Sequence, residues 1–240
     1  MKKSERHRAK RDELVTVFER AHLYVEENLR QVGLAAAGAV LLVLGSLGVL
    51  RWTDARAEKA SFLLGRMIQA YRAPLALSPE AQQAPPGTPT YGTAEERDTK
   101  VIEMADDLMA RFGSSKAAPK ALYYKALGLG SQKKYDDAAK VLGELLRRYP
   151  RDFLAPLARY QLARVREAEG NPAEALIHFQ ALAEDSRGLF PREEGLIGVA
   201  RCQEEIGKSD EALKAYRRIL SEFPDSEYAG EARSKIDQLS

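Results

Sequence analysis

The sequence has 240 residues but only one cysteine, Cys202. A single cysteine excludes a disulfide within the chain. It also excludes a lipoprotein anchor, which requires a cysteine directly after an N-terminal apolar segment. Because Cys202 lies within a helical apolar pattern, we expect a buried thiol that packs as a small hydrophobic side chain.

Histidine is scarce as well, and no arrangement typical of a catalytic or metal site is found. His7 and His22 lie near the N-terminus, and His178 lies far away on a predicted helix. The sequence "GLG" at 128–130 lacks the third glycine of a dinucleotide-binding fingerprint. We therefore expect no catalytic residues, no cofactor and no metal, and we expect that the protein is not an enzyme.

Neither sign of charge is in excess over most of the chain. Lysine and arginine total 37, and aspartate and glutamate total 35. The first 31 residues hold 8 basic and 6 acidic residues, which leaves 29 of each kind in residues 51–240. A nucleic-acid-binding surface needs a clustered basic face. We therefore expect no nucleic-acid partner.

Long apolar segments are absent except at residues 31–50, where no charged residue occurs. Twenty helical residues rise about 30 Å, the hydrocarbon thickness of a bilayer. Trp52 follows at the expected interface. We predict a transmembrane helix over 32–52. The alternatives are a buried core helix and a cleaved signal peptide, for which Ala55-Arg56-Ala57 resembles a cleavage site.

Residues 1–31 form a basic N-terminal tail in which apolar residues recur at helical spacing. The pattern predicts an amphipathic helix, which is either an interfacial docking helix or a plain extension of the span. The apolar series comprises Leu14, Phe18, Ala21, Val25 and Val32. Basic residues lie on both sides of the span, so local charge does not decide the orientation.

A pattern of small and large apolar residues repeats every 37 residues in the C-terminal part of the chain. Repeats with a constant spacing and helical periodicity indicate stacked helical units. The corresponding positions are Ala121, Ala158 and Gly195; Ala126, Ala163 and Ala200; Ala138, Ala175 and Ala212; Leu142, Phe179 and Tyr216; and Leu145, Leu182 and Ile219.

The sequence Gly207-Lys208-Ser209 resembles the end of a phosphate-binding loop. That loop needs a glycine five residues earlier, where Cys202 stands. The pattern instead predicts a helix that ends at Gly207 and another that begins near Ser209.

The three copies resemble the tetratricopeptide repeat in their small residues, their alanines and their closing proline at Pro150 and Pro224. The second copy departs from the pattern, with Pro172 at the turn aromatic and Arg187 at the proline. The period of 37 also exceeds the usual 34, through longer links between repeats. The resemblance implies an all-α fold, a tetratricopeptide-type α-solenoid tethered to a single transmembrane helix.

This resemblance divides the chain after the span into two parts. We expect a membrane-proximal helix and Pro-rich loop over 53–94, followed by a solenoid over 95–240. Residues 53–72 are expected to form the first helix of the opening repeat, and residues 73–94 a surface loop that joins it to the second helix. Within the solenoid, a lone second helix over 101–115 precedes three repeats, and a capping helix ends the stack. The repeats cover about 119–150, 156–187 and 193–224, and the capping helix covers 226–239.

The segment "LYVEENLRQVGLAAAG" and the following "ARAEKASFLLGRMIQAY" are similar to the start of the ancillary Sec translocon subunit family. Tyr24, Glu26, Glu27 and Asn28 stand at the aromatic-x-Glu-Asn motif of that family. The resemblance implies a single-pass protein of the bacterial inner membrane, with a cytoplasmic N-terminus and a periplasmic repeat domain. It also implies the Sec translocon and periplasmic chaperones as partners.

Tetratricopeptide stacks hold a peptide or helix against their first helices. The family's groove positions correspond here to Lys120, Tyr123, Leu127, Tyr160, Arg164, Glu167, Ile197, Arg201 and Glu204. Aromatic, aliphatic and charged residues together suit a protein or peptide ligand with apolar anchors. The family's carboxylate clamp needs lysine and asparagine where Tyr123 and Leu127 stand, so that class of co-chaperone is excluded. Each residue could equally be ordinary solvent-facing surface.

Two functions remain open. One is a membrane-anchored scaffold that binds proteins or peptides in the cell envelope and assists hand-over of translocated proteins near the Sec translocon. The alternative is a structural scaffold for cell-division or wall-synthesis complexes. Both use the solenoid, and the sequence does not separate them.

Overall fold

A computed structural model describes residues 28–186 and 188–240. Residues 1–27 lie outside the described residues, and so does the part of the expected amphipathic helix that they contain. So do the aromatic-x-Glu-Asn motif up to Glu27, the histidines His7 and His22, and Arg187.

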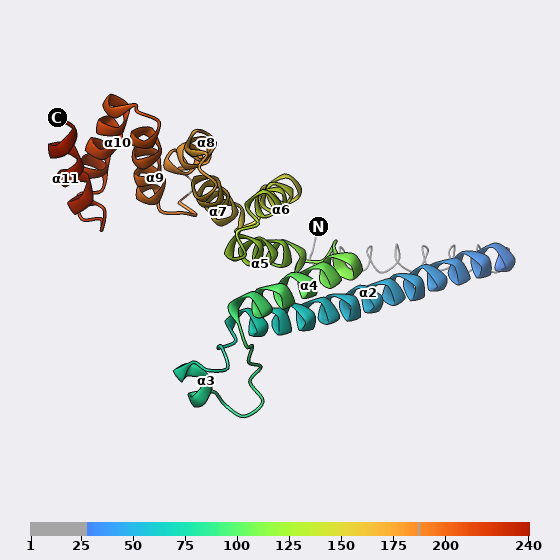
Figure 1. The fold of residues 1–240 in the computed structure, drawn as a ribbon. Helices are drawn as coiled ribbons and strands as arrows, with labels where there is room; N and C mark the ends of the chain where they lie inside the picture. The colour runs from blue at the N-terminus through green and yellow to red at the C-terminus, as the bar shows by residue number, and fades with distance from the viewer. Residues whose placement is uncertain (1–27, 187) are drawn as a thin grey trace, which may run out of the picture. The chain divides into compact units, whose positions relative to one another are not determined.

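The described part of the chain is all-α, and its only β feature is an isolated bridge between Leu75 and Tyr91. Figure 1 shows the helices from blue to red along the chain. They are α2 (Leu29–Arg72), α3 (Pro79–Gln83), α4 (Ala94–Phe112), α5 (Ala118–Ser131), α6 (Tyr135–Arg148), α7 (Ala155–Ala168), α8 (Pro172–Ala183), α9 (Arg192–Glu205), α10 (Ser209–Glu222) and α11 (Ala229–Leu239).

The helix boundaries confirm the 37-residue repeat. The first helices of the three pairs, α5, α7 and α9, begin at 118, 155 and 192, and α11 continues this series at 229. The second helices, α6, α8 and α10, begin at 135, 172 and 209. Both series advance by 37 residues, so each repeat is one helix–turn–helix unit and α11 is the expected capping helix.

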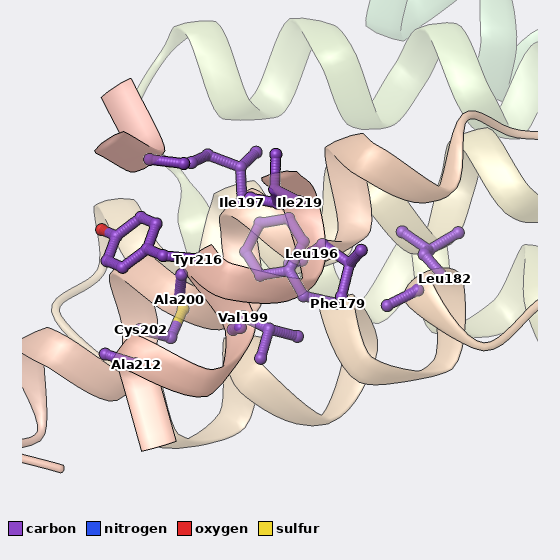
Figure 2. Close-up of a cluster of buried hydrophobic side chains, with 14 of the residues drawn as sticks. Phe179, Leu182, Leu196, Ile197, Val199, Ala200, Cys202, Ala212, Tyr216 and Ile219 are labelled. Atoms are coloured by element: carbon purple, nitrogen blue, oxygen red, sulfur yellow. The ribbon is translucent and has the colours of Figure 1, made fainter. Parts of the chain in front are cut away.

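The repeated apolar positions are buried, as predicted. Ala138, Ala175 and Ala212 are fully buried where the two helices of each repeat approach closely. Phe179 of α8 and Tyr216 of α10 fill the space between neighbouring helices, and Figure 2 shows them in one cluster with residues of α9. The Cys202 thiol lies in the same cluster and is buried. The core is therefore continuous through these stacked helices.

The turn inside each repeat is a helix C-cap with one residue in the left-handed region. Lys133, Gly170 and Gly207 have φ angles of 58°, 81° and 78°. The backbone N–H of the following residue returns to the carbonyl five residues earlier, for example from Lys208 to Gln203 at 2.8 Å. This bond is the one that defines a Schellman motif. Gly207-Lys208-Ser209 therefore ends one helix and starts the next, as predicted, and is not part of a phosphate loop.

A further helix pair precedes the three repeats. Leu64 and Met67 of α2 are buried in one cluster with Val101 and Leu108 of α4. The Arg56 guanidinium also donates to the carbonyl oxygen of Arg111 at 2.6 Å. The helix expected at 101–115 therefore begins earlier, at Ala94, and its partner is the part of α2 that contains the helix expected over 53–72.

The chain divides into two units between Ala55 and Arg56. The second unit, Arg56–Ser240, contains α4 to α11 and the part of α2 that packs on α4. It also contains residues 56–94, which the sequence pattern assigned to a separate membrane-proximal segment.

Among the described residues, α2 is the one helix that is long and apolar enough to cross a membrane by length and composition. None of its most apolar 18-residue window is buried. A core helix buries most of such a window, so that alternative is wrong. A signal sequence near the N-terminus meets the same criteria as a span, and that alternative remains open.

Gly195 of α9 provides a test of the close helix approach. A Cβ atom at this position would lie 2.4 Å from the backbone nitrogen of Ala183. We expect Gly195→Ala to lower the free energy of unfolding by about 1–3 kcal/mol through overpacking. Gly143 is the matched control, because a Cβ there meets no atom within 4 Å. Gly143→Ala should stabilise α6 by about 0.5–1 kcal/mol. Urea unfolding of both variants measures the difference, and shifts of the same sign would contradict the packing of α9 on α8.

Candidate peptide-binding groove

A surface cavity of about 410 Å³ lies between α5, α6 and α7. Its lining includes Leu127 of α5, and Tyr160 and Arg164 of α7, three of the residues that the sequence predicted for a groove. Tyr135 and Leu142 of α6 and Gln161 of α7 complete its walls. We call this cavity the α5–α7 groove.

Tyr160 is held in place by aromatic contacts below the groove. Its ring centroid lies 6.0 Å from that of Phe179 and 5.1 Å from that of Phe190. The Arg164 guanidinium donates to the Tyr160 hydroxyl at 3.4 Å. The tyrosine is therefore a fixed wall, and its hydroxyl and the arginine form one polar edge.

The α5–α7 groove has a mixed apolar and polar lining with a single cation. Ala126, Leu127, Leu142 and Val165 contribute apolar surface, and Arg164 is exposed. Among the described residues that line the groove, none carries a carboxylate. Glu167 lies outside the lining, with its Oε2 atom 3.3 Å from Arg164 Nε. The groove therefore suits an apolar side chain whose neighbouring group is neutral or negative.

Two other predicted residues lie on α5 beside the groove. Tyr123 is hydrogen-bonded to Gln161, and burial raises the pKa of its hydroxyl, so the side chain stays neutral. The Lys120 ammonium lies 5.7 Å from the ring centroid of Phe153, which is 60% exposed. The helical pattern did not single out Gln161 or Phe153. Phe153 could have been found from the sequence, because it is a phenylalanine in the link between two repeats.

Glu167 lies beside the buried cysteine rather than in open solvent. Burial raises the pKa of the Glu167 carboxyl, and its Oε1 atom lies 3.7 Å from Cys202 Sγ. Burial also raises the pKa of the Cys202 thiol to about 12. The thiolate is the reactive form of cysteine, so Cys202 is an inert core residue.

Two predicted groove residues of the third repeat, Arg201 and Glu204, already bond other side chains of the protein. Arg201 forms two hydrogen bonds to Glu231 of α11, at 2.9 and 2.6 Å. Glu204 accepts from Lys235 at 2.5 Å and from the Tyr216 hydroxyl at 3.0 Å. Both side chains therefore fasten the capping helix to α9.

The prediction that Ile197 lines a groove is wrong. Its side chain is 2% exposed and belongs to the core cluster with Ile219 of α10 and Ala232 of α11 (Figure 2). The corresponding residues of the preceding repeats, Tyr123 and Tyr160, are only partly buried. The nine predicted residues therefore do not form one continuous surface.

Comparison with known proteins places these features in a family. A family model described as a tetratricopeptide repeat-like domain matches residues 24–240. A comparison with curated proteins found no match.

Two solved structures are similar to part of the chain. One is the crystal structure of PilW, described as a widely conserved type IV pilus biogenesis factor, at 19% identity and a TM-score of 0.48. The match covers 60% of this chain and 59% of that chain, which is less than two thirds of its length. The other contains nearly identical TPR-like repeats and is named for a kinesin light chain of Podosopora anserina. It has 13% identity, a TM-score of 0.48, and coverage of 60% and 77% of the two chains.

Proposed function

The chain belongs to the tetratricopeptide repeat-like domain family, and from this premise we propose that its α5–α7 groove binds an extended segment of a partner protein. A tetratricopeptide-like fold is a scaffold for protein–protein interaction. The observation that carries the proposal is the cavity beside Leu127 that is edged by Tyr160 and Arg164. Aromatic and arginine side chains are the commonest anchors of binding energy in protein interfaces.

The proposed partner segment is extended, with one apolar side chain that enters the groove. An aliphatic or aromatic side chain would contact Leu127, Leu142 and Val165. An acidic residue or a main-chain carbonyl of the segment would accept from Arg164. Because the groove lining holds only one charged side chain, Arg164, binding should weaken only modestly between low and moderate salt.

We further propose that the protein is anchored in the bacterial inner membrane through residues 32–52, with a cytoplasmic N-terminus and periplasmic repeats. The apolar segment of α2 and the similarity to ancillary Sec translocon subunits support this placement. The same similarity supports the Sec translocon and periplasmic chaperones as partners, and the absence of enzymatic activity.

Site-specific crosslinking in cells tests the choice of partner. A photoreactive amino acid at Leu127 is expected to capture Sec subunits or periplasmic chaperones, identified by mass spectrometry. The same amino acid at Asp237, an exposed position on α11, is the control. Capture of cell-division or wall-synthesis proteins from Leu127, without Sec components, would favour the alternative scaffold function.

Paired substitutions in the α5–α7 groove test the site itself. We expect Leu127→Ala with Arg164→Ala to weaken binding of the crosslinked partner by at least about 2 kcal/mol. Tyr160 is left in place because its ring supports Phe179. The matched control is Leu189→Ala with Arg217→Ala, which removes an exposed leucine and an exposed arginine elsewhere. Calorimetric titration measures both, and equal affinity of the two folded variants would place the interface elsewhere.

The orientation of the chain is testable with one added cysteine. Gln82 of α3 is exposed, whereas the native Cys202 is buried and its thiol pKa is raised to about 12. We expect Gln82→Cys to react with a membrane-impermeant maleimide in intact cells, while the unmodified protein does not. Labelling of Gln82→Cys only after lysis would place the repeats in the cytoplasm.

A further inference from the structure

The connection between α2 and α4 is unlike the other connections inside helix pairs. Helix α2 ends at Arg72 and α4 begins at Ala94, which leaves 21 residues between them. The three later pairs are joined by residues 132–134, 169–171 and 206–208. Connections longer than about 12–15 residues are uncommon in compact domains and are usually functional or disordered.

This long connection is ordered by its own contacts. Ala76 N–H donates to the Tyr91 carbonyl oxygen at 2.8 Å, and Tyr91 N–H donates to the Pro74 carbonyl oxygen at 3.4 Å. Ser78 caps the short helix α3, and the Tyr91 ring packs against the cluster between α2 and α4. The two ends of the connection are therefore bonded to each other, and Tyr91 fixes its second end against the helix pair.

The connection builds the wall of a cavity of about 680 Å³, larger than the α5–α7 groove. Leu63 and Ala70 of α2, Met104 of α4, and Pro89 and Tyr91 of the connection provide its apolar surface. The same cavity is also lined by charged side chains, which are Arg66, Lys100, Glu103 and Asp107. A second cavity of about 370 Å³ adjoins it and shares Tyr91 with it. We call the two cavities together the α2–α4 trench.

Charge is unequal along the α2–α4 trench. Glu95, Glu96 and Glu103 line the second cavity, whereas Lys100 is its one cation. Lys100 is held by Glu103 at 3.0 Å, and Glu96 accepts from the Gly92 N–H at 2.8 Å. The described structure gives the exposed Glu95 carboxylate no partner. Over the two cavities, the lining carboxylates Glu95, Glu96, Glu103 and Asp107 outnumber the lining cations Arg66 and Lys100. The trench therefore combines apolar surface with an excess of carboxylates.

We propose that the α2–α4 trench is a second binding site, which accepts a protein segment with a large apolar side chain followed by a lysine or arginine. The apolar side chain lies between Leu63, Met104 and Tyr91. The basic side chain lies against Glu95 and Glu103, where opposite charge favours it and disfavours an acidic residue. This site is separate from the α5–α7 groove and does not depend on the function proposed for that groove.

Two labelled peptides that differ in one charge test the site. The probes are Gly-Ser-Phe-Gly-Lys-Ser-Gly and the same peptide with Glu in place of Lys, titrated by fluorescence anisotropy. The full chain is used in nanodiscs of phosphatidylcholine. We expect the lysine peptide to bind at least about 10-fold more tightly than the glutamate peptide. Equal affinity of the two peptides overturns the proposal.

Substitutions then assign the binding to the trench. Glu95→Lys should reduce the preference for the lysine peptide at least about fivefold, whereas Asp237→Lys, the same charge change on α11, should leave it unchanged. Replacing residues 77–89 with a short Gly-Ser linker should abolish the preference, with folding checked by thermal melting. The double variant Leu127→Ala with Arg164→Ala should leave the preference for the lysine peptide unchanged. Binding that survives the linker replacement overturns the proposal, as does binding to phosphatidylglycerol vesicles with no peptide preference.

Discussion

Residues 56–240 are expected to form a soluble helical unit that is more stable than residues 92–240 by at least about 3 kcal/mol. The shorter fragment loses the part of α2 whose Leu64 and Met67 side chains are buried against α4. Each fully buried leucine or methionine contributes about 1.5–3 kcal/mol. Beginning the shorter fragment at Gly92 retains the Thr93 cap of α4, which accepts from the Glu96 N–H at 3.1 Å. Urea unfolding followed by circular dichroism measures the difference.

A single substitution separates the loss of packing from the change in chain length. Met67 is fully buried, and Met67→Ala in residues 56–240 should lower the free energy of unfolding by about 2–5 kcal/mol. Gln69 is exposed on the same helix, and Gln69→Ala should change it by less than about 0.5 kcal/mol. Equal denaturation midpoints for the two fragments would show that α2 is not part of the folded unit.

Replacing Phe179 by alanine is expected to lower the free energy of unfolding of residues 56–240 by about 3–5 kcal/mol. The ring is 1% exposed and packs against α9, where a Cβ atom on Gly198 would lie 2.4 Å from it. It also supports Tyr160 of the α5–α7 groove, with their ring centroids 6.0 Å apart. Removing the ring leaves a cavity that the surrounding helices cannot fill without moving.

Ile177 provides the matched control for this substitution. It lies on the same helix, but its side chain is 61% exposed. We expect Ile177→Ala to change the free energy of unfolding by less than about 0.5 kcal/mol. If the two alanine variants unfold at the same urea concentration, Phe179 does not fill the space between α8 and α9.

The sequence alone was sufficient to predict the three repeats and their core. Small residues such as Ala138, Ala175 and Ala212 recur where two helices cross, and large apolar residues recur on the same face. Both requirements arise within one helix–turn–helix unit, whose contacts are local in the chain. Constant spacing of 37 residues therefore identifies the helices, the turns and the buried positions together.

The groove was predicted only in part, because exposure depends on the neighbouring repeat. Leu127, Tyr160 and Arg164 meet in one cavity, as the family pattern implies. Ile197 occupies the position that corresponds to Tyr160, yet its side chain is 2% exposed and belongs to the core cluster. Arg201 is held by Glu231 of the capping helix. Position within a repeat does not reveal how deeply a side chain is buried or which side chain it bonds.

By itself, the sequence determined the all-α repeat architecture, the buried cysteine and the apolar segment over residues 31–50. Only the tertiary structure decided which side chains of α2 and α4 meet and that the connection between them lines a trench. The physical reason is the range of the interactions. Helical periodicity records which side of a helix is buried, whereas the identity of the covering segment depends on contacts between residues far apart in the chain.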